Sequence, residues 1–439
     1  MGVAQRAITA LAEQYAARFR ETLRPIRMIG REAEFPIVYP DGRAGDVLQL
    51  WKPLLARGEF APRYDDPDAR TLIVALTGPD GTVEVEVGRA TVELVVGPYE
   101  DLWQLAEGSS RLLLHVVEAV HEMGMRVLGF GIQPRSRASR ALMTPKRRYG
   151  YFAQVVGRAW WHFTATAADQ VHVDISRAEL VDAVNTLNLL SAPLIALTAN
   201  SSVYAGRPGR YLSGREGLLG MLGEGRAGMT PGPFLSVEEF VRHICRYPCY
   251  VLRRDGGFRP YNRPFEEYLQ AHGPDINAYL WHEHYTWNSA RPRAHNSTLE
   301  IRPACQQPHG EPLVVAALAL GWVEALAEVQ AFLQDALPDP WTTMRRYRRA
   351  AILHGLRAEE PVTGFVEGVV RIAERGLRRR GRGEESFLGP LWERLEQRTT
   401  PGDRAREVVR SQGVAALVDA ASYQLSRPTR NYRPPYGTL

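Results

Sequence analysis

Apolar and polar residues alternate in several short runs within the first 305 residues, whereas helical spacing dominates the rest of the chain. Alternation predicts a strand, because successive side chains of an extended chain point to opposite faces of a sheet. Strands are expected at residues 27–38, 82–87, 91–96, 126–134, 168–176, 249–254 and 297–304. Helices are expected at residues 3–22, 100–123, 178–199, 236–246 and 264–272, and over most of the chain beyond residue 312. The pattern therefore predicts an α+β fold.

No internal repeat and no long low-complexity linker separates these expected elements. We therefore expect a single domain over residues 1–439. Its strand-rich core covers residues 1–310, and a helical C-terminal region at 311–439 packs on that core, with a basic break at 377–385. Two of the strands, 82–87 and 91–96, are predicted to form a hairpin.

Composition is that of an ordinary globular protein, with 45% hydrophobic residues, 23% charged residues and a net charge of +5. No run of 18 apolar residues occurs, so we expect a cytoplasmic protein that has no membrane partner. Only Lys52 and Lys146 are lysines among 54 basic residues. A GC-rich genome is the simplest explanation of this excess of arginine. Since an ammonium and a guanidinium bind differently, each retained lysine is a candidate for a position where arginine would not serve. Three cysteines are too few for a disulfide framework or a zinc knuckle.

Charged side chains recur at alternate positions of the expected strands, so that each strand presents them on one face. Glu32 and Glu34 lie two residues apart in the first strand, where like charges on one face repel each other. The other strands repeat this arrangement with Glu84, Glu86, Glu93, Gln170, His172, Asp174, Glu300 and Arg302. On a single strand such alternation is typical of a sheet with one solvent-exposed face. As a set, acidic strands in an arginine-rich protein indicate a binding surface.

Carboxylates crowded on one surface all stay ionised only where cations lie between them. Oxygen ligands with one histidine suit Mg²⁺ or Mn²⁺, which usually share their coordination shell with water and substrate phosphates. Neither GxxxxGK[ST] nor a GxGxxG that follows a strand occurs, so a P-loop or a dinucleotide-binding fold lacks its signature. The sequence therefore predicts a metal and nucleotide-phosphate site that is built on a sheet.

Seven stretches between residues 30 and 308 occur in the order known from one enzyme family. They are GREAEF (30–35), TVELVVGP (91–98), LGFGIQP (128–134), TPKRRYGYF (144–152), DQVHVDI (169–175), ANSSVYAGRPGRYLSGR (199–215) and STLEIRPACQQP (297–308). With them the chain resembles the plant-type branch of the glutamate–cysteine ligases, together with related bacterial carboxylate–amine ligases and the γ-glutamylcysteine synthetases of ergothioneine pathways. One departure is Cys305, which stands where the family often has an acidic residue.

The resemblance implies a glutamine-synthetase-like fold, in which a curved antiparallel sheet forms a half-barrel or funnel surrounded by helices. The inner face of that sheet would bind ATP and two to three Mg²⁺ or Mn²⁺ ions. The metal ligands that it implies are Glu32, Glu34, Glu86, Glu93, His172 and Glu300. Glu86 matches less well than the others, because its spacing to Glu93 is one residue longer than the family pattern.

The same resemblance implies an ATP-dependent ligase that forms a γ-glutamyl amide through an acyl phosphate. It gives catalytic roles to Arg215, Arg302 and Glu300, and ATP contacts to Gln170, Arg302 and Arg215. It places Lys146, Arg148 and Tyr149 beside the amino-acid substrate. The expected substrates are ATP, L-glutamate or a similar acid, and an amine such as L-cysteine, with no nucleic acid and either a monomer or a homodimer.

Several alternatives stay open at this point. The same chemistry could use another acid or amine, or the chain could bind nucleotide without catalysis. The arginine run at 377–382 could bind RNA, although a solvated loop between helices is the simpler interpretation. Residues 281–284 (WHEH) would place two histidines on one face of a strand and could form a second metal site. Cys245 and Cys249 are interpreted as packed free thiols.

Overall fold

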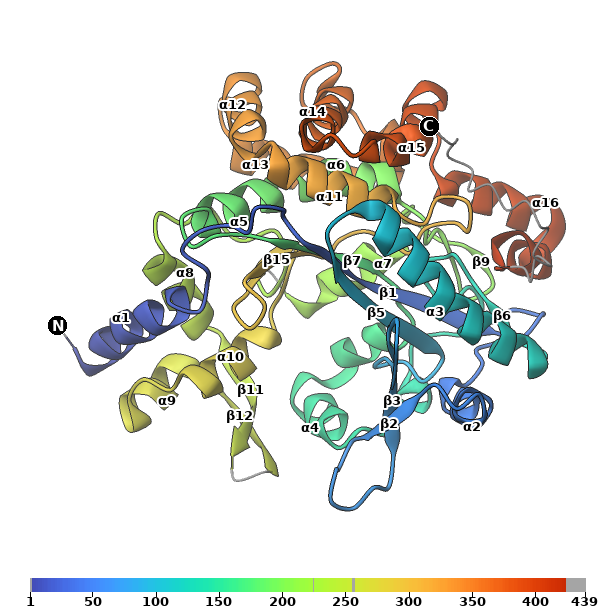
Figure 1. The fold of residues 1–439 in the computed structure, drawn as a ribbon, viewed down its shortest axis with the longest axis horizontal. Helices are drawn as coiled ribbons and strands as arrows, with labels where there is room; N and C mark the ends of the chain where they lie inside the picture. Colours follow the sequence, from blue (N-terminus) through green and yellow to red (C-terminus); the bar gives the residue numbers. More distant parts are fainter. Residues whose placement is uncertain (1, 224, 255–256, 424–439) are drawn as a thin grey trace.

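An antiparallel sheet of nine strands forms the centre of the computed structural model, which describes residues 2–223, 225–254 and 257–423 (Figure 1). Its strand order is β14-β15-β7-β1-β5-β4-β3-β2, and β6 pairs with β1 beside this path. The strands are β1 (Ile29–Val38), β2 (Ala61–Tyr64), β3 (Ile73–Gly78), β4 (Gly81–Val85), β5 (Thr91–Tyr99), β6 (Arg126–Val127), β7 (Asp169–Asp174), β14 (Ala290–Arg293) and β15 (Thr298–Ile301). This large antiparallel sheet with surrounding helices confirms the predicted α+β fold.

Two long helices cover one face of the sheet. Helix α3 (Leu102–Glu122) contacts β5 and β1, and α11 (Val314–Glu324) contacts β7. The strands meet them with alternate apolar side chains that are fully buried, such as Leu94 on β5 and Val173 on β7. Since alternate residues of a strand point to opposite faces, Glu93 and His172 must point to the other face. The acidic face of the sheet is therefore the one turned away from α3 and α11.

A smaller layer lies against that acidic face, below the sheet in Figure 1. It contains α4 (Arg147–Val156), α10 (Ile276–His284) and the hairpin of β11 (Pro248–Arg254) and β12 (Gly257–Pro264). Aromatic side chains hold it together: the rings of Phe152 and Tyr285 lie 4.1 Å apart, and those of Phe152 and Trp160 lie 4.8 Å apart. The acidic face is thus covered in large part by an aromatic layer that lies against the sheet.

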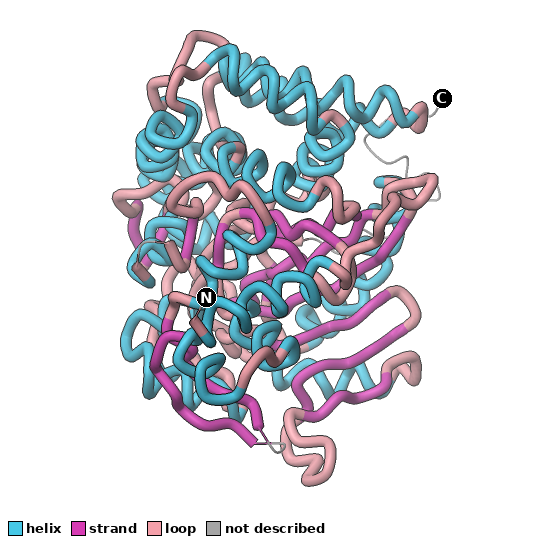
Figure 2. Tube along the Cα trace, turned by 90° about the vertical axis from the view of Figure 1, so that its left-hand side faces the viewer, coloured by secondary structure: helices cyan, strands magenta, loops and turns pink. Residues whose placement is uncertain are grey.

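The C-terminal region is helical throughout its described part, as predicted, and Figure 2 shows these helices gathered beyond the strands. Residues 424–439 of the predicted helical region lie outside the described residues. The remaining helices are α1 (Val3–Ala16), α2 (Trp51–Ala56), α5 (Leu180–Leu189), α6 (Ser191–Thr198), α7 (Gly214–Leu219), α8 (Val237–Cys245), α9 (Phe265–His272), α12 (Leu326–Ala336), α13 (Pro340–His354), α14 (Phe365–Arg380), α15 (Gly389–Gln397) and α16 (Pro401–Ala421). Two further short sheets pair β8 (Val203–Tyr204) with β9 (Arg207–Pro208) and β10 (Ala227–Gly228) with β13 (Trp287–Asn288).

Four expected elements have different bounds or a break in the structure. The helix expected at 3–22 ends at Ala16. The strand predicted at 126–134 ends at Val127. Beyond it the chain packs closely at Gly129 and Gly131, where an added Cβ would lie 2.7 Å from the Gln307 carbonyl and 2.6 Å from the Cys305 Cβ. The helix predicted at 178–199 is two helices, α5 and α6, bent by 46°. The basic break predicted at 377–385 begins later, since α14 continues to Arg380.

Among the described residues no single helix is long and apolar enough to cross a membrane. Two bent helix pairs, α5 with α6 and α11 with α12, pass the same test by length and composition alone.

The stretch at 281–284 is the end of helix α10, so the strand prediction for it is wrong. Asp275 caps this helix by accepting a hydrogen bond from the Ala278 amide. In a helix, residues two positions apart point in different directions, so His282 and His284 share no face. The Nε2 of His282 donates to the Ile244 carbonyl at 2.9 Å, and its ring stacks on Phe265. His282 is therefore a packed side chain of the core, outside the metal-ligand groups of the described residues.

His282 should make the protein sensitive to acid. Burial and the nearby Arg226 lower its pKa to about 3, whereas the unfolded chain takes up the proton near pH 6.5. The folded state thus binds fewer protons between these values, so the contribution is fully present above the unfolded pKa and declines as the pH falls, by about 1.4 kcal/mol per pH unit. We expect the melting temperature to fall less between pH 7 and pH 4.5 in His282→Gln than in the wild type. His121→Gln, at an exposed site, is the control, and equal slopes in all three proteins would contradict the assignment.

Candidate active site

Glu34, Glu86 and Glu93 form the first of two ligand groups on the acidic face. Strand pairing places Glu34 of β1 directly opposite Glu93 of β5, and the chain leaves β4 at Val85 to bring Glu86 beside them. One ligand oxygen from each residue lies within 4.8 Å of the other two. Glu84, the predicted same-face partner of Glu86, lies opposite Glu93 on the other side but is bound by Arg63. Of that pair, only Glu86 therefore joins this acidic group.

These three carboxylates lie close together, and too few positive charges lie near them to balance their negative charge. Burial and the neighbouring Glu86 raise the pKa of Glu34 to about 7, although its oxygens accept hydrogen bonds from the Ala168 amide at 2.7 Å and from Gln170 Nε2 at 2.6 Å. Burial and the surrounding carboxylates, Glu86 foremost, raise the pKa of Glu93 well above its usual range. Such a group favours a bound cation, because a cation would remove the repulsion that raises these pKa values.

Glu32, His172 and Glu300 form the second ligand group, on the neighbouring strands β1, β7 and β15. His172 of β7 lies between Gly30 of β1 and Glu300 of β15. Its Nε2 is 3.0 Å from a carboxylate oxygen of Glu32, and its Nδ1 is 3.3 Å from the Thr298 hydroxyl. Although burial opposes it, the contact with His172 lowers the pKa of Glu32. As in the first group, one ligand atom from each residue lies within 4.8 Å of the other two.

Glu300 is 1% exposed and is surrounded by three arginines. Arg291 of the neighbouring strand β14 donates from Nε at 2.8 Å and from Nη2 at 3.1 Å, in a two-pronged contact. Arg293 Nε lies 3.3 Å away, and Arg302 donates to the other side of the carboxylate. Glu300 therefore fixes the positions of three guanidinium groups, and Arg291 and Arg293 are site residues that the sequence interpretation missed.

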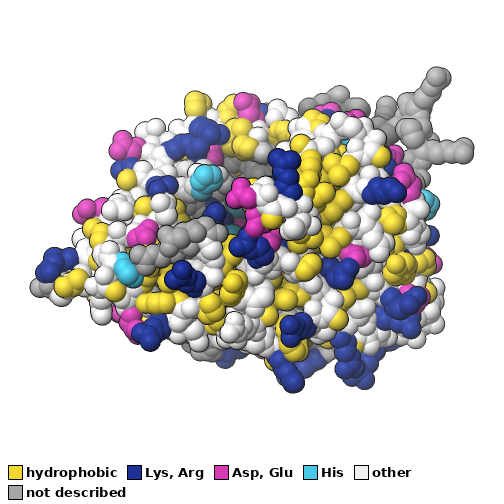
Figure 3. Space-filling view, turned by 90° about the horizontal axis from the view of Figure 1, so that it is seen from below, with side chains coloured by type: hydrophobic (Ala, Val, Ile, Leu, Met, Phe, Trp, Pro, Cys, Tyr) yellow, Lys and Arg dark blue, Asp and Glu magenta, His cyan; other side chains and the backbone are white. Residues whose placement is uncertain are grey.

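A cavity of about 280 Å³, here called the inner cavity, lies between the acidic face and the aromatic layer. Every residue predicted to bind ATP or substrate lines this cavity, and so do four of the six predicted metal ligands. Its charged and polar lining consists of Glu32, Glu34, Glu84, Glu86, Glu93, Lys146, Arg148, Tyr149, Thr166, Gln170, Arg215, His284, Tyr285, Arg291 and Arg302. In the view of Figure 3 the surface is hollowed near its centre, where acidic, basic and histidine side chains gather.

The predicted substrate residues reach the inner cavity from the start of α4. Lys146 is 4% exposed, and its Nζ donates to the Val85 carbonyl beside the first ligand group. Burial and the neighbouring Arg148 lower the pKa of this lysine. The ring of Tyr149 lies 5.3 Å from Nζ and 5.2 Å from the Arg148 guanidinium. Two cations beside an aromatic ring thus face five carboxylates across the cavity.

Arg215 and Arg302 approach from the opposite side. Arg215 lies at the start of α7, is 3% exposed and pairs with Glu216, which Arg348 binds in turn. Its amide donates to the Ser201 hydroxyl at 3.0 Å, so the chain turn at this point is fixed. Arg302 follows β15 directly and is held by Glu300. Both guanidinium groups line the inner cavity, where their charge faces the carboxylates.

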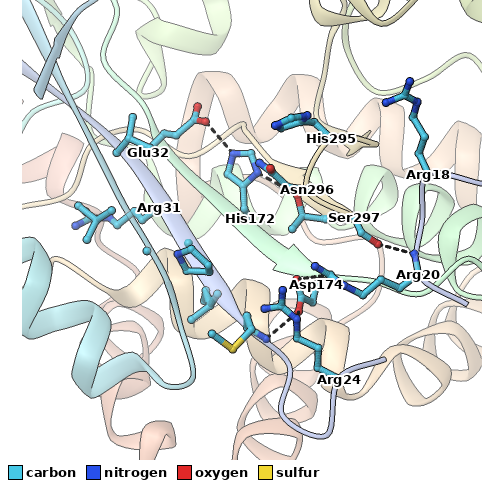
Figure 4. A pocket seen from close by; sticks show the side chains of 18 residues that line it. Arg18, Arg20, Arg24, Arg31, Glu32, His172, Asp174, His295, Asn296 and Ser297 are labelled. Atoms are coloured by element: carbon cyan, nitrogen blue, oxygen red, sulfur yellow. Dashed lines mark hydrogen bonds and ion pairs between the residues drawn. The ribbon is translucent and has the colours of Figure 1, made fainter. Parts of the chain in front are cut away.

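A larger cavity of about 490 Å³, here called the outer cavity, lies on the other side of Glu32 and His172 (Figure 4). Glu32 and Val95 line both cavities. Arginines and polar side chains make up much of the outer lining, including Arg18, Arg20, Arg24, Asp174, His295 and Asn296. The second ligand group therefore lies at the boundary between an acidic compartment and a basic one.

Cys305 lies outside the residues that line the two cavities. It is 1% exposed, and its Sγ is 3.2 Å from the Ser201 hydroxyl and 3.5 Å from that of Ser213. These two contacts keep it packed among small polar side chains. Cys305 is thus packed as a small buried side chain, and Cys245 and Cys249 are buried free thiols, in keeping with their interpretation as packed thiols.

The arginine run at 377–382 lies at the end of α14 and just beyond it. Each of its charged members is paired: Arg378 with Glu374, Arg379 with Glu328, Arg380 with Glu324 and Glu384, and Arg382 with Asp101. Arg380 and Arg382 therefore join the end of α14 to the core, whereas Arg378 and Arg379 are exposed. The interpretation as a solvated loop is right about the exposure of these two side chains and wrong about their place, which is in a helix.

The donor sets of the two groups fit divalent magnesium or manganese. Five carboxylates and one imidazole offer the hard oxygen and nitrogen ligands that these ions take. Burial, together with the neighbouring Glu86, raises the pKa values of Glu34 and Glu93, so a bound cation would stabilise their ionised forms. The six predicted ligands thus divide into two groups of three, a division that the sequence pattern had not indicated.

The family model of glutamate-cysteine ligase family 2 (GCS2) matches residues 28–420. This match covers most of the chain, including every predicted site residue. The chain belongs to glutamate-cysteine ligase family 2. Membership makes it an ATP-dependent ligase that forms a carbon–nitrogen bond, which confirms the predicted family and enzyme class.

Relatives and a solved structure agree with this assignment. The chloroplastic glutamate–cysteine ligase of Brassica juncea is 27% identical over 364 residues, which cover 76% of this chain and 68% of the relative. That of Arabidopsis thaliana is 27% identical over 362 residues, with 76% and 67% covered. The glutamate–cysteine ligase of Francisella tularensis, solved in complex with AMP, has a TM-score of 0.56 at 11% identity over 92% of this chain and 88% of that one. This structural similarity shows that the present chain has the same fold as the Francisella tularensis ligase.

Proposed function

We propose that the chain joins the γ-carboxylate of L-glutamate to an amine, most simply L-cysteine, and cleaves ATP to do so. The observation that supports this proposal is that the first ligand group and five cationic side chains line one cavity, which the second ligand group meets through Glu32. Phosphoryl transfer to a carboxylate requires positioning and neutralisation of charge, and it requires little covalent chemistry from the protein. The inner cavity provides both positioning groups and charges of each sign.

The first ligand group, Glu34 with Glu86 and Glu93, would hold one divalent ion, and the second, Glu32 with His172 and Glu300, would hold another. We propose two to three ions of Mg²⁺ or Mn²⁺ in all, with the remaining ligands supplied by water and phosphate. When bound, such ions neutralise and polarise the transferring phosphoryl group. Glu34 is held for this role by the Ala168 amide and Gln170, which fix both of its oxygens.

In the proposed first step, an oxygen of the γ-carboxylate attacks the terminal phosphorus of ATP. The bond from that phosphorus to the ADP oxygen breaks, and an acyl phosphate forms. Arg302 and Arg215 line the cavity where the phosphoryl oxygens would lie, and their charge stabilises the transition state. Glu300 acts on this step through Arg302, which it orients.

In the second step, the amine nitrogen attacks the acyl carbon, the carbon–oxygen bond to phosphate breaks, and the amide forms. The ammonium form must lose a proton before it attacks, and a carboxylate of the inner cavity would accept that proton. The carboxylates of the inner cavity attract this cation, while Lys146 and Arg148 offer charge to the α-carboxylate of the acid. The proposed partners are these small molecules alone, without nucleic acid, and the oligomeric state is either monomeric or homodimeric.

The proposal is tested with purified protein, ATP, Mg²⁺ and L-glutamate against a panel of amines that includes L-cysteine. We expect ADP release that depends on both the acid and the amine, together with one γ-glutamyl amide per ADP. A different preferred acid or amine would keep the chemistry and change the assigned substrate. A complete lack of amine-dependent ADP release over a broad panel would show the proposal to be wrong.

A further inference from the structure

One wall of the outer cavity consists of residues that precede the family match. The match begins at residue 28, whereas Arg18, Arg20 and Arg24 belong to the segment that links α1 to β1. Figure 4 shows these three arginines across the cavity from Glu32 and His172. The basic wall therefore lies outside the region that defines the family, and the family match says nothing of its role.

Hydrogen bonds fix the path of this segment over the end of β7. The amide of Arg20 donates to the Ser297 hydroxyl at 2.9 Å, and the amide of Arg177 donates to the Arg20 carbonyl at 2.7 Å. Arg27 is 7% exposed, donates from Nη1 to the Asp174 carbonyl and pairs with Glu179. The three cavity-lining arginines thus project from an anchored stretch of chain.

The outer cavity has more positive charge than its own carboxylates neutralise. Asp174 is shared, at 3.4 Å from Arg20 and 3.8 Å from Arg24. Arg18 makes no ion pair with any other described residue, and its side chain is exposed. Glu32, the other carboxylate of the lining, is already in contact with His172. A basic hollow of this kind attracts anions, and guanidinium groups bind phosphate oxygens in a two-pronged geometry.

We propose that the outer cavity holds the ADP part of ATP, and that Arg18 and Arg24 bind its phosphates. The inference rests on the proposed function, because it assumes that ATP is the phosphoryl donor at the second ligand group. Glu32 lines both cavities, so a triphosphate that ends beside Glu32 and His172 reaches outward along the basic wall. The terminal phosphoryl group reaches Arg215 and Arg302 in the inner cavity, which otherwise holds the acid and the amine. The N-terminal segment thus determines nucleotide affinity, and it does not take part in bond making.

Nucleotide affinity measured by calorimetry, without turnover, tests this inference. Mg²⁺ with ADP is titrated into the wild type, Arg18→Ala, the double variant Arg18→Ala with Arg24→Ala, and Arg43→Ala. Arg43 is an exposed arginine on the turn after β1, remote from both cavities, and is the matched control. Loss of one charge-assisted contact should raise Kd about tenfold, and loss of both about 100-fold. The control should match the wild type, and Arg18→Lys should recover part of the affinity.

Steady-state kinetics separates this inference from the proposed function. We expect the KM for ATP to rise with Kd in the arginine variants, while kcat and the KM for the acid stay unchanged. Unchanged Kd and unchanged KM for ATP in an active double variant would overturn the inference and leave the function intact. A rise in the KM for the acid instead would place the acid in the outer cavity and overturn the inference too. A wild-type protein that neither binds nor cleaves ATP would overturn the function itself.

Discussion

Glu93→Gln is expected to lower kcat for amine-dependent ADP release by about 1000-fold, which corresponds to about 4 kcal/mol of transition-state stabilisation. Glu93 lies between Glu34 and Glu86, and its side chain is 7% exposed at the floor of the inner cavity. Glutamine has the same shape but removes the negative charge, so the first ligand group would hold a divalent ion far less tightly. Steady-state ADP release at saturating Mg²⁺ measures this effect.

Glu84→Gln is the matched control for this variant. Glu84 lies directly opposite Glu93 in the pairing of β4 and β5, but it is outside the ligand group and is bound by Arg63. Its substitution should change kcat by about twofold at most. Equal losses in the two variants would mean that the general acidity of this face matters and that no specific ligand group exists.

Glu300→Ala is expected to lower the free energy of unfolding by about 3–5 kcal/mol, because it leaves buried arginines without their carboxylate. Arg291 and Arg302 both donate to Glu300, and Arg293 is within 3.3 Å. Their side chains are 5%, 12% and 23% exposed, so water compensates the loss only in part. Urea unfolding followed by circular dichroism, with a chelator present, measures the change.

Glu93→Gln provides the contrast under the same conditions. It removes one member of a crowded carboxylate group, so it should leave the stability of the metal-free protein unchanged or raise it. Substitution of Glu300 would thus destabilise the metal-free protein and substitution of Glu93 would not, although we expect both glutamates to be needed for activity. A loss below about 1 kcal/mol in Glu300→Ala would contradict the inferred role of this glutamate in holding the three arginines.

Much of the site could be predicted from the sequence, because its ligands stand at alternate positions of strongly apolar strands. Glu32, Glu34, Glu93, His172 and Glu300 follow that pattern. Their division into two groups could not be predicted, since it depends on which strands pair. The pairing of β1 with β5 on one side and β7 on the other decides it.

Other parts of the site gave weaker signals. Arg291 and Arg293 lie two residues apart on β14, but Pro292 between them argued against a strand. The structure allows it because β14 is at the edge of the sheet. Arg18 lies within the helix expected at 3–22 and Arg24 lies just beyond it. Because that helix ends at Ala16, only the folded chain reveals which cavity these two side chains face. The helix at 276–284 was missed because a short stretch with charged and aromatic residues gives no clear period.

The central claim is that ATP activates a carboxylate in the inner cavity. The most direct test supplies L-glutamate labelled with oxygen-18 in its γ-carboxylate, together with ATP, Mg²⁺ and the preferred amine. If the acid is phosphorylated, the oxygen that leaves with phosphorus must come from that carboxylate. Mass analysis of the released phosphate should therefore show one labelled oxygen for each amide formed. Unlabelled phosphate alongside amide formation would contradict the claim.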